Sequence, residues 1–353
     1  MSPITLEFLP AREGDAIWID AGPTRIQIDG GRIATCRDLR TRIEAMIEEG
    51  KALDLLVVTH VDRDHIEGVL EMLKAGKCPE IRDVWFNGYV HLLDEAIESY
   101  SPQQGEALSR LIRTRQLPWN HAFGGKRIAV VDGDPLPSRT VGEITLTLLS
   151  PTPGKLEDLR GPWKKACEDA GLIPGVPATA EPLPPEIESF GPIDIEELAD
   201  KPFEADHAEP NGSSIAFLLE HDGKRVLLSG DAHPEILIAS IDRILEESGE
   251  DKLAIDLFKL PHHGSRKNVS KDLLEKLDCP RYVFSTNGSY FDHPDPVAVA
   301  RVLKFGGADK TLYFNYHSPE SLIWDKPDWK TRYNYSTVYP AADENGFLII
   351  EVR

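Results

Sequence analysis

Short runs of apolar residues alternate with polar turns along most of the chain, and this pattern predicts a mixed α/β protein. Strands are expected over 4–10, 16–19, 25–29, 55–58, 84–87, 127–132, 144–150, 215–220, 225–229, 255–260, 281–285, 311–315 and 346–352. Helical spacing appears over 39–50, 66–73 and 92–115, with a break at Pro102, and a further helix is expected after Pro234. Strands and helices therefore alternate through much of the sequence.

Four side chains that bind metals lie between the strand at 55–58 and the helix at 66–73. They are His60, Asp62, Asp64 and His65. In an extended chain the first three point the same way, because side chains alternate, and the fourth follows at the start of the helix. Imidazole and carboxylate groups suit zinc, manganese or iron better than a thiolate site would. This turn is where we expect the chemistry.

The run from His60 to His65 resembles the HxHxDH signature of the metallo-β-lactamase superfamily, with Asp62 in place of the second histidine. This HxDxDH form is similar to the branch that contains the soluble domain of the ComEC competence protein and related predicted nucleases or phosphodiesterases. The turns at 13–16 and 28–31 resemble the GDA and DGG turns near the start of the family's sequences. The resemblance implies an αββα sandwich of two mixed β-sheets flanked by helices, with metals at one edge.

The resemblance also implies a binuclear site with ligands from three stretches of the chain. The ligands would be His60 and Asp62 for the first metal; Asp64, His65 and one of His262 or His263 for the second; and Asp231 as the bridge. Strand alternation predicts that the two adjacent histidines face opposite ways. Asn211 occupies the place of a further histidine ligand, so the third ligand of the first metal stays open, with His207 as one alternative.

Other residues are candidates for catalysis or substrate contact. Asp64 and His293 are the catalytic candidates, and the substrate-binding candidates are Asn211, Ser265 and Asn287. Two interpretations apply to Ser265 and Lys259. Both contact a phosphate, or Ser265 caps the following helix and Lys259 faces solvent. We expect the remaining histidines of these regions to be structural or to lie near the ligands without binding metal: His91, His121 and His233.

The 353 residues are expected to form a single domain with an insertion at about 151–206. The insertion is Pro-rich and acidic, which predicts an irregular segment. The simpler interpretation of the insertion is a loop on the protein surface. The functional interpretation is a lid over the substrate or an arm that docks a protein partner.

The formal net charge is -20, which disfavours a broad phosphate-binding surface. The four cysteines form no CxxC pair, no secretory leader opens the chain, and no apolar run reaches the roughly 20 residues of a membrane helix. These features predict a cytoplasmic protein without membrane association. GxGxxG, GxxxxGK[ST] and GxSxG motifs are absent, which argues against nucleotide-cofactor chemistry and serine hydrolysis.

The sequence thus favours a metal-dependent hydrolase, in first place a phosphodiesterase or nuclease that uses a metal-bound hydroxide. Its cofactors would be two divalent metal ions, Zn²⁺ first and Mn²⁺ as competitor. The expected partner is a phosphodiester substrate, with nucleic acid as one form of it. Two alternatives stay open: hydrolysis of a carboxylic ester, thioester or lactone, and an effector or binding subunit of a bacterial defence assembly.

Overall fold

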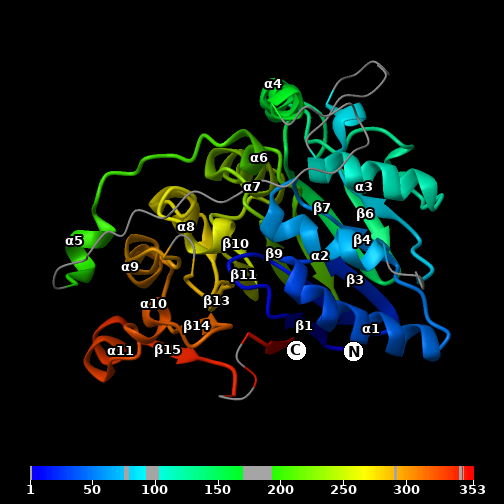
Figure 1. The fold of residues 1–353 in the computed structure, drawn as a ribbon. Helices are drawn as coiled ribbons and strands as arrows, with labels where there is room; N and C mark the ends of the chain where they lie inside the picture. The colour runs from blue at the N-terminus through cyan, green and yellow to red at the C-terminus, as the bar shows by residue number, and fades with distance from the viewer. Residues whose placement is uncertain are drawn as a thin grey trace.

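The computed structural model of the chain describes residues 2–74, 79–92, 103–169, 193–289, 292–341, 344 and 346–353. Two large β-sheets lie face to face, and helices cover both outer faces (Figure 1). This is the αββα sandwich that the sequence predicts. The terminal strands β1 (Ile4–Phe8) and β16 (Leu348–Val352) pair with each other, so the two chain ends lie together.

The first sheet has six strands in the order β16-β1-β2-β3-β4-β5. Its remaining strands are β2 (Ile17–Ala21), β3 (Thr24–Ile28), β4 (Leu55–Val57) and β5 (Val84–Trp85). The strands from β16 to β3 pair antiparallel, whereas β3, β4 and β5 pair parallel. The polar loop with His60 leaves the sheet at the carboxyl end of β4.

The second sheet has eight strands in the order β15-β14-β13-β11-β9-β8-β7-β6. They are β15 (Tyr335–Val338), β14 (Lys310–Phe314), β13 (Arg281–Phe284), β11 (Leu257–Lys259), β9 (Lys224–Leu228), β8 (Ala216–His221), β7 (Ile144–Ser150) and β6 (Ser138–Val141). The strands from β15 to β9 are parallel and the last three pairs antiparallel. A separate small ladder joins β10 (Leu253–Ala254) to β12 (Leu277–Asp278).

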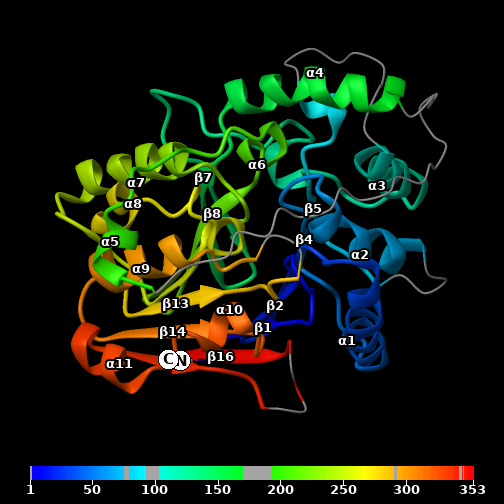
Figure 2. The ribbon, with the colours of Figure 1, turned by 60° about the vertical axis from the view of Figure 1, so that its left-hand side comes forward.

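The helices divide between the two outer faces (Figure 2). On the side of the first sheet lie α1 (Cys36–Glu48), α2 (Arg63–Lys74) and α3 (Gln103–Thr114), which packs against α2. The helix α4 (Pro153–Asp169) contacts the 3-10 turn at Tyr89–His91. Against the second sheet pack α5 (Ile195–Ala199), α7 (Pro234–Ser248), α8 (Lys271–Glu275) and α9 (Pro296–Phe305). The short helices are α6 (Glu209–Gly212), α10 (Pro319–Leu322) and α11 (Pro327–Tyr333), with 3-10 turns at Ile33–Thr35, Tyr89–His91, His121–Phe123 and Pro261–Gly264.

The main core lies between the sheets, because the alternating apolar side chains of strands such as β1 and β7 all turn to that side. One predicted strand, over 127–132, is wrong. Ile128 and Val130 do point into the core, but the backbone of Ile128 bonds in both directions to the Asn87 side-chain amide, at 2.9 Å each. The Val130 N–H donates to Pro151 O at 2.7 Å. The apolar pattern over 127–132 therefore reflects which side chains are buried and not the pairing of a strand.

The described part of the segment at 151–206 is more regular than its composition predicts. Residues 153–169 form α4, and Leu156, Leu159 and Trp163 are buried at helical spacing in the same apolar cluster as residues of α1, α2 and α3. Residues 195–199 form α5, which begins at an Asp194 cap. The Pro-rich run at 174–185 lies outside the described residues.

Candidate metal centre

Two loops press against the first turn of α2. The Gly30 N–H donates to His65 O at 2.7 Å, and a Cβ on Gly68 would lie 1.8 Å from Gly30 O. On the other side, a Cβ on Gly14 would lie 1.8 Å from Asp64 O. Only residues without side chains permit these approaches, which explains the glycines of the two opening turns. The approach fixes the backbone that carries Asp64 and His65.

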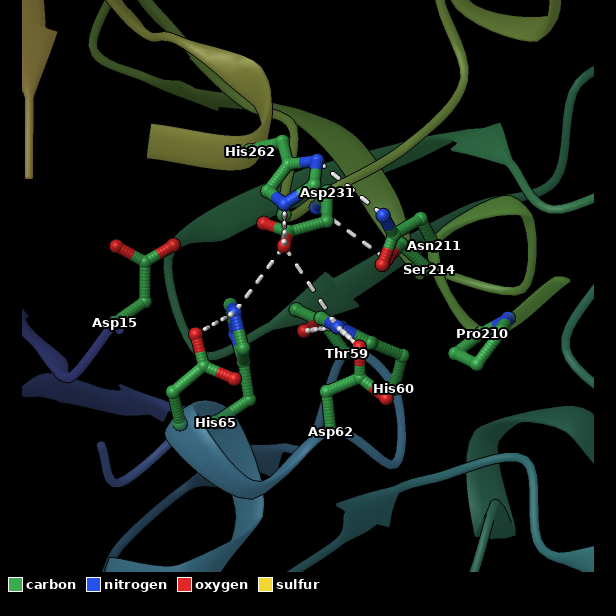
Figure 3. A network of polar contacts seen from close by, with 12 residues as sticks. Asp15, Thr59, His60, Asp62, His65, Pro210, Asn211, Ser214, Asp231 and His262 are labelled. Carbon is green, nitrogen blue, oxygen red and sulfur yellow. Dashed lines mark hydrogen bonds and ion pairs between the residues drawn. The ribbon is translucent and has the colours of Figure 1, made fainter. Parts of the chain in front are cut away.

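Four imidazoles converge on one carboxylate oxygen, Oδ2 of Asp231, which follows β9. Figure 3 shows His60, His65 and His262 among them. The distance from this oxygen to Nε2 is 3.4 Å for His65, 3.6 Å for His263, 3.8 Å for His60 and 3.9 Å for His262. These residues come from three separate turns at the same edge of the sandwich. The sequence predicted all five as members of one site, and the fold brings them together.

Two further carboxylates divide the imidazoles into groups. Asp62 Oδ2 lies 3.6 Å from His60 Nε2. Asp64 Oδ2 lies 3.6 Å from His263 Nε2 and 3.8 Å from His65 Nε2. We call the first pair group one and the second set group two; Asp231 adjoins both groups. The resemblance assigns these two groups to different metals, and that assignment stays a prediction.

The donor atoms suit divalent cations. Two atoms that bind the same cation at about 2.1 Å each cannot lie more than about 4.2 Å apart, and all of the distances above satisfy this limit. Among the residues that the structure describes, His60 Nε2 and Asp231 Oδ1 are buried without a hydrogen-bond partner. Buried polar atoms normally have one, so these two indicate a ligand that protein atoms do not replace.

The charge of Asp231 also reflects its surroundings. Burial alone would raise the pKa of this carboxyl, but the imidazoles of His65, His263 and His262 outweigh burial and hold the pKa well below its usual value. Asp231 is therefore ionised at neutral pH. An ionised buried carboxylate between two groups of imidazoles is suited to bridging two cations.

Hydrogen bonds at the Nδ1 atoms orient the imidazoles of His60, His65 and His263. His65 Nδ1 donates to Asp29 Oδ2 at 2.8 Å. The Thr59 hydroxyl also donates to Asp29 Oδ2, at 2.7 Å, and so accepts from His60 Nδ1 at 3.0 Å. His263 Nδ1 donates to the backbone oxygen of Ser285 at 2.9 Å. Each ring is thereby held with its Nε2 lone pair toward Asp231.

Some residues of this centre are not among the candidates that the sequence motifs predict. Asp29 belongs to one of the opening turns, and the only signal for its role is a carboxylate in a glycine turn that carries the resemblance. Asp15, in the other opening turn, forms a buried ion pair with Lys259 and lies in the same cluster, since ligand atoms of Asp15, His65, Asp231 and His263 fall within 4.8 Å of one another. Lys259 therefore faces the interior rather than solvent.

The expected opposite orientation of His262 and His263 is wrong. Both residues have left-handed backbones, with φ of 48° and 56°, rather than the extended conformation on which strand alternation depends. Both rings therefore reach Asp231. Gly264 continues this turn with φ of 86°.

The remaining candidates lie around this centre at various distances. The His293 ring stands 5.5 Å from the His262 ring, between centroids. Asn211 donates to Asp206 Oδ2 at 2.7 Å and lies beside His262. Ser265 is buried and its hydroxyl accepts from Lys267 N at 3.3 Å, within its own turn, so it does not face solvent. The Asn287 side-chain oxygen accepts from the backbone and hydroxyl of Ser289, and no contact joins it to the two groups within the described residues.

Two other histidines occupy different environments. His207, the alternative ligand, is exposed, whereas its neighbour Asp206 is the buried one. His233 is the residue just before α7 and makes no capping hydrogen bond with its side chain. Its Nε2 donates to Ala208 O at 3.1 Å, and its Nδ1 lies 2.9 Å from Lys155 Nζ. His233 therefore has protein partners at both ring nitrogens, in agreement with a role next to the ligands rather than among them.

Residues 9–288 match the family model described as the metallo-beta-lactamase superfamily. The chain belongs to this superfamily. Metallo-β-lactamase superfamily proteins are metal-dependent hydrolases that typically bind divalent metals, and the His and Asp cluster lies inside the matched range. A comparison with curated protein sequences finds no match.

Several solved structures of metallo-β-lactamase proteins and related hydrolases are similar to this chain. YhfI from Bacillus subtilis has 12% identity with 99% of each chain covered and a TM-score of 0.42. A putative metal-dependent hydrolase from Parabacteroides distasonis has 13% identity, covering 95% of this chain and 92% of its own, with a TM-score of 0.37. A diphosphatase of the PhnP family has 11% identity, covering 96% of this chain and 84% of its own, with a TM-score of 0.35.

In the described ranges, no helix has both the length and the apolar character needed to cross a membrane.

Proposed function

We propose that this metallo-β-lactamase superfamily protein hydrolyses phosphodiesters, as a phosphodiesterase or nuclease, with two divalent cations, Zn²⁺ or Mn²⁺. The observation that carries the proposal is Asp62, which replaces an imidazole by a carboxylate in group one. Its side chain lies 3.6 Å from His60 Nε2 and is 43% exposed, so it is reached from solvent. The resemblance of the HxDxDH form to the ComEC-like branch supports the same class of substrate.

The charge balance favours an anionic substrate. Two divalent cations would bring four positive charges against the three carboxylates of Asp62, Asp64 and Asp231. Asp15 is balanced separately by Lys259. With water bound rather than hydroxide, the cations and these three ligands would together carry one net positive charge, inside a protein whose formal net charge is -20. A phosphodiester carries one negative charge and is therefore attracted to this centre locally, without a broad basic surface.

The residues of the chain have distinct tasks in this proposal. Bound cations supply Lewis acidity and lower the pKa of water. His60 and Asp62 would hold one cation, and Asp64, His65 and His263 would hold the other. Asp231 lies between the two groups and would contribute to both. His293 stands at the edge of the centre beside His262, and we assign it contact with the substrate.

The test measures hydrolysis of bis(p-nitrophenyl) phosphate and p-nitrophenyl acetate by protein of known metal content, with Zn²⁺ or Mn²⁺. The variant is the double substitution Asp64→Ala and His65→Ala. The matched control is Asp251→Ala with His121→Ala, the same chemical changes at two exposed positions. We expect at least about 100-fold loss of phosphodiester hydrolysis in the site variant and wild-type activity in the control.

Each other result has a definite meaning. Hydrolysis of the acetate ester without the phosphodiester would replace the proposal by ester, thioester or lactone hydrolysis. Hydrolysis of neither substrate by protein that holds two metals would favour a binding subunit. Activity that survives in the site variant would show that another part of the chain, or a contaminant, is responsible.

A further inference from the structure

The two groups of ligands differ in number. Asp64, His65, His263 and Asp231 supply four donors to group two, which completes a tetrahedral set. His60, Asp62 and Asp231 supply only three to group one. A fourth donor should therefore lie within about 4.2 Å of Asp231 Oδ2 and outside group two.

His262 meets this requirement. Its Nε2 lies 3.9 Å from Asp231 Oδ2, as Figure 3 shows, and its ring projects from the left-handed turn beside His263. His207 does not meet it, since that side chain is exposed on the surface. The remaining alternative is the side-chain oxygen of Asn211, which is buried without a hydrogen-bond partner in the described part of the chain.

The polar contacts of His262 Nδ1 decide which ring nitrogen carries the proton. Asn268 Oδ1 lies 3.1 Å away, Asn211 Nδ2 lies 3.2 Å away and Asp206 Oδ2 lies 3.4 Å away. The Asn268 amide cannot be turned round, because its Nδ2 donates to Asp206 Oδ2 at 3.1 Å and to Asp231 O at 3.3 Å. Two oxygen acceptors, one of them charged, therefore face Nδ1, and Nδ1 carries the proton.

His262 then has the same arrangement as the other three imidazoles. Each donates from Nδ1 to an oxygen and turns its Nε2 lone pair toward Asp231. The carboxylate behind it, Asp206, is buried and accepts from Ala208 N at 3.0 Å as well as from the two amides. A carboxylate behind a histidine is the arrangement that orients metal-binding imidazoles.

We propose that His262 is the fourth ligand of group one and that Asp206, with Asn268, is the positioning residue that holds it. Asn211 helps to hold the Asp206 carboxylate in place through its hydrogen bond to Asp206 Oδ2. The inference rests on the two-metal centre of the proposed function, but it concerns metal binding and not the substrate.

The experiment compares zinc content and zinc affinity of the full chain by elemental analysis and by competition with a chromophoric chelator. We expect two zinc ions in wild type and one in His262→Ala. His262→Cys should recover two, because a thiolate also binds zinc. Asp206→Asn should weaken one of the two sites by about 10–100-fold. His207→Ala is the control and should bind zinc like wild type.

Melting temperatures of the metal-free proteins separate a folding defect from the loss of a ligand. Recovery of the second zinc ion in His262→Cys would not occur if His262 had a purely structural role. Two zinc ions at wild-type affinity in His262→Ala would overturn the assignment and favour Asn211. A wild-type chain with fewer than two zinc ions would also overturn it. Two zinc ions in wild type without phosphodiester hydrolysis would refute the proposed function and leave the ligand assignment intact.

Discussion

Asp29 gives the sharpest test of how this centre is built, because it supports imidazoles of both groups without touching a metal. Its carboxylate accepts three hydrogen bonds, from His65 Nδ1 at 2.8 Å, from Thr59 Oγ1 at 2.7 Å and from Thr59 N at 2.8 Å. Asn has only one side-chain oxygen. In Asp29→Asn, an amide N–H must therefore face at least one of these donors.

The expected effect is a loss of about 10–100-fold in zinc affinity, which is the usual cost of removing such a partner. This corresponds to about 1.4–2.8 kcal/mol of binding free energy. Both sites should weaken, since His65 belongs to group two and Thr59 relays the effect to His60 in group one. Chelator competition measures the two affinities.

The control is Asp20→Asn, the same substitution on the neighbouring strand β2, where the carboxylate is partly exposed and accepts from Trp18 Nε1 at 2.9 Å. This variant should bind zinc like wild type. Wild-type zinc affinity at both sites in Asp29→Asn would refute the reasoning, as would an equal weakening in the control. A lower melting temperature with unchanged affinity would show that Asp29 serves only the fold.

Three further predictions concern the surroundings of the centre. Gly14→Ala places a Cβ 1.8 Å from Asp64 O, so it should lower zinc affinity and destabilise the fold by about 1–3 kcal/mol in urea denaturation; unchanged values would contradict the close approach. Trp163→Ala should cost about 3–5 kcal/mol in the same assay if α4 belongs to the core, and a cost below 1 kcal/mol would argue against it. Burial lowers the pKa of His91 to about 4, so the unfolded chain binds its proton first as the pH falls below 6.5. From pH 7.5 to 5 wild type should therefore lose about 2 kcal/mol more stability than His91→Gln, and parallel losses would refute this.

The local patterns of the sequence predicted most strands of the two large sheets, the helices α1, α2, α3 and α7, and the candidate ligands that are close in sequence. The strands β6 and β15 were not predicted. The stretches from His60 to His65 and at His262–His263 marked two of the turns that carry metal-binding side chains. The predictions were wrong where a pattern had a second physical origin. Ile128 and Val130 are both buried in the core, so their alternation indicated burial although no strand forms there. The helix α4 was not predicted, because the Pro-rich and acidic composition of residues 151–206 indicated an irregular segment.

The sequence by itself determined which side chains are able to bind metal and that they lie on turns after buried strands, because both properties belong to short segments. Only the tertiary structure decided how those side chains are oriented. Asp29 lies 36 residues before His65, and Asp206 lies 62 residues before Asn268, so their hydrogen bonds exist only once the sheets have packed. The left-handed turn that directs both His262 and His263 at Asp231 likewise depends on backbone dihedral angles that residue types alone do not specify.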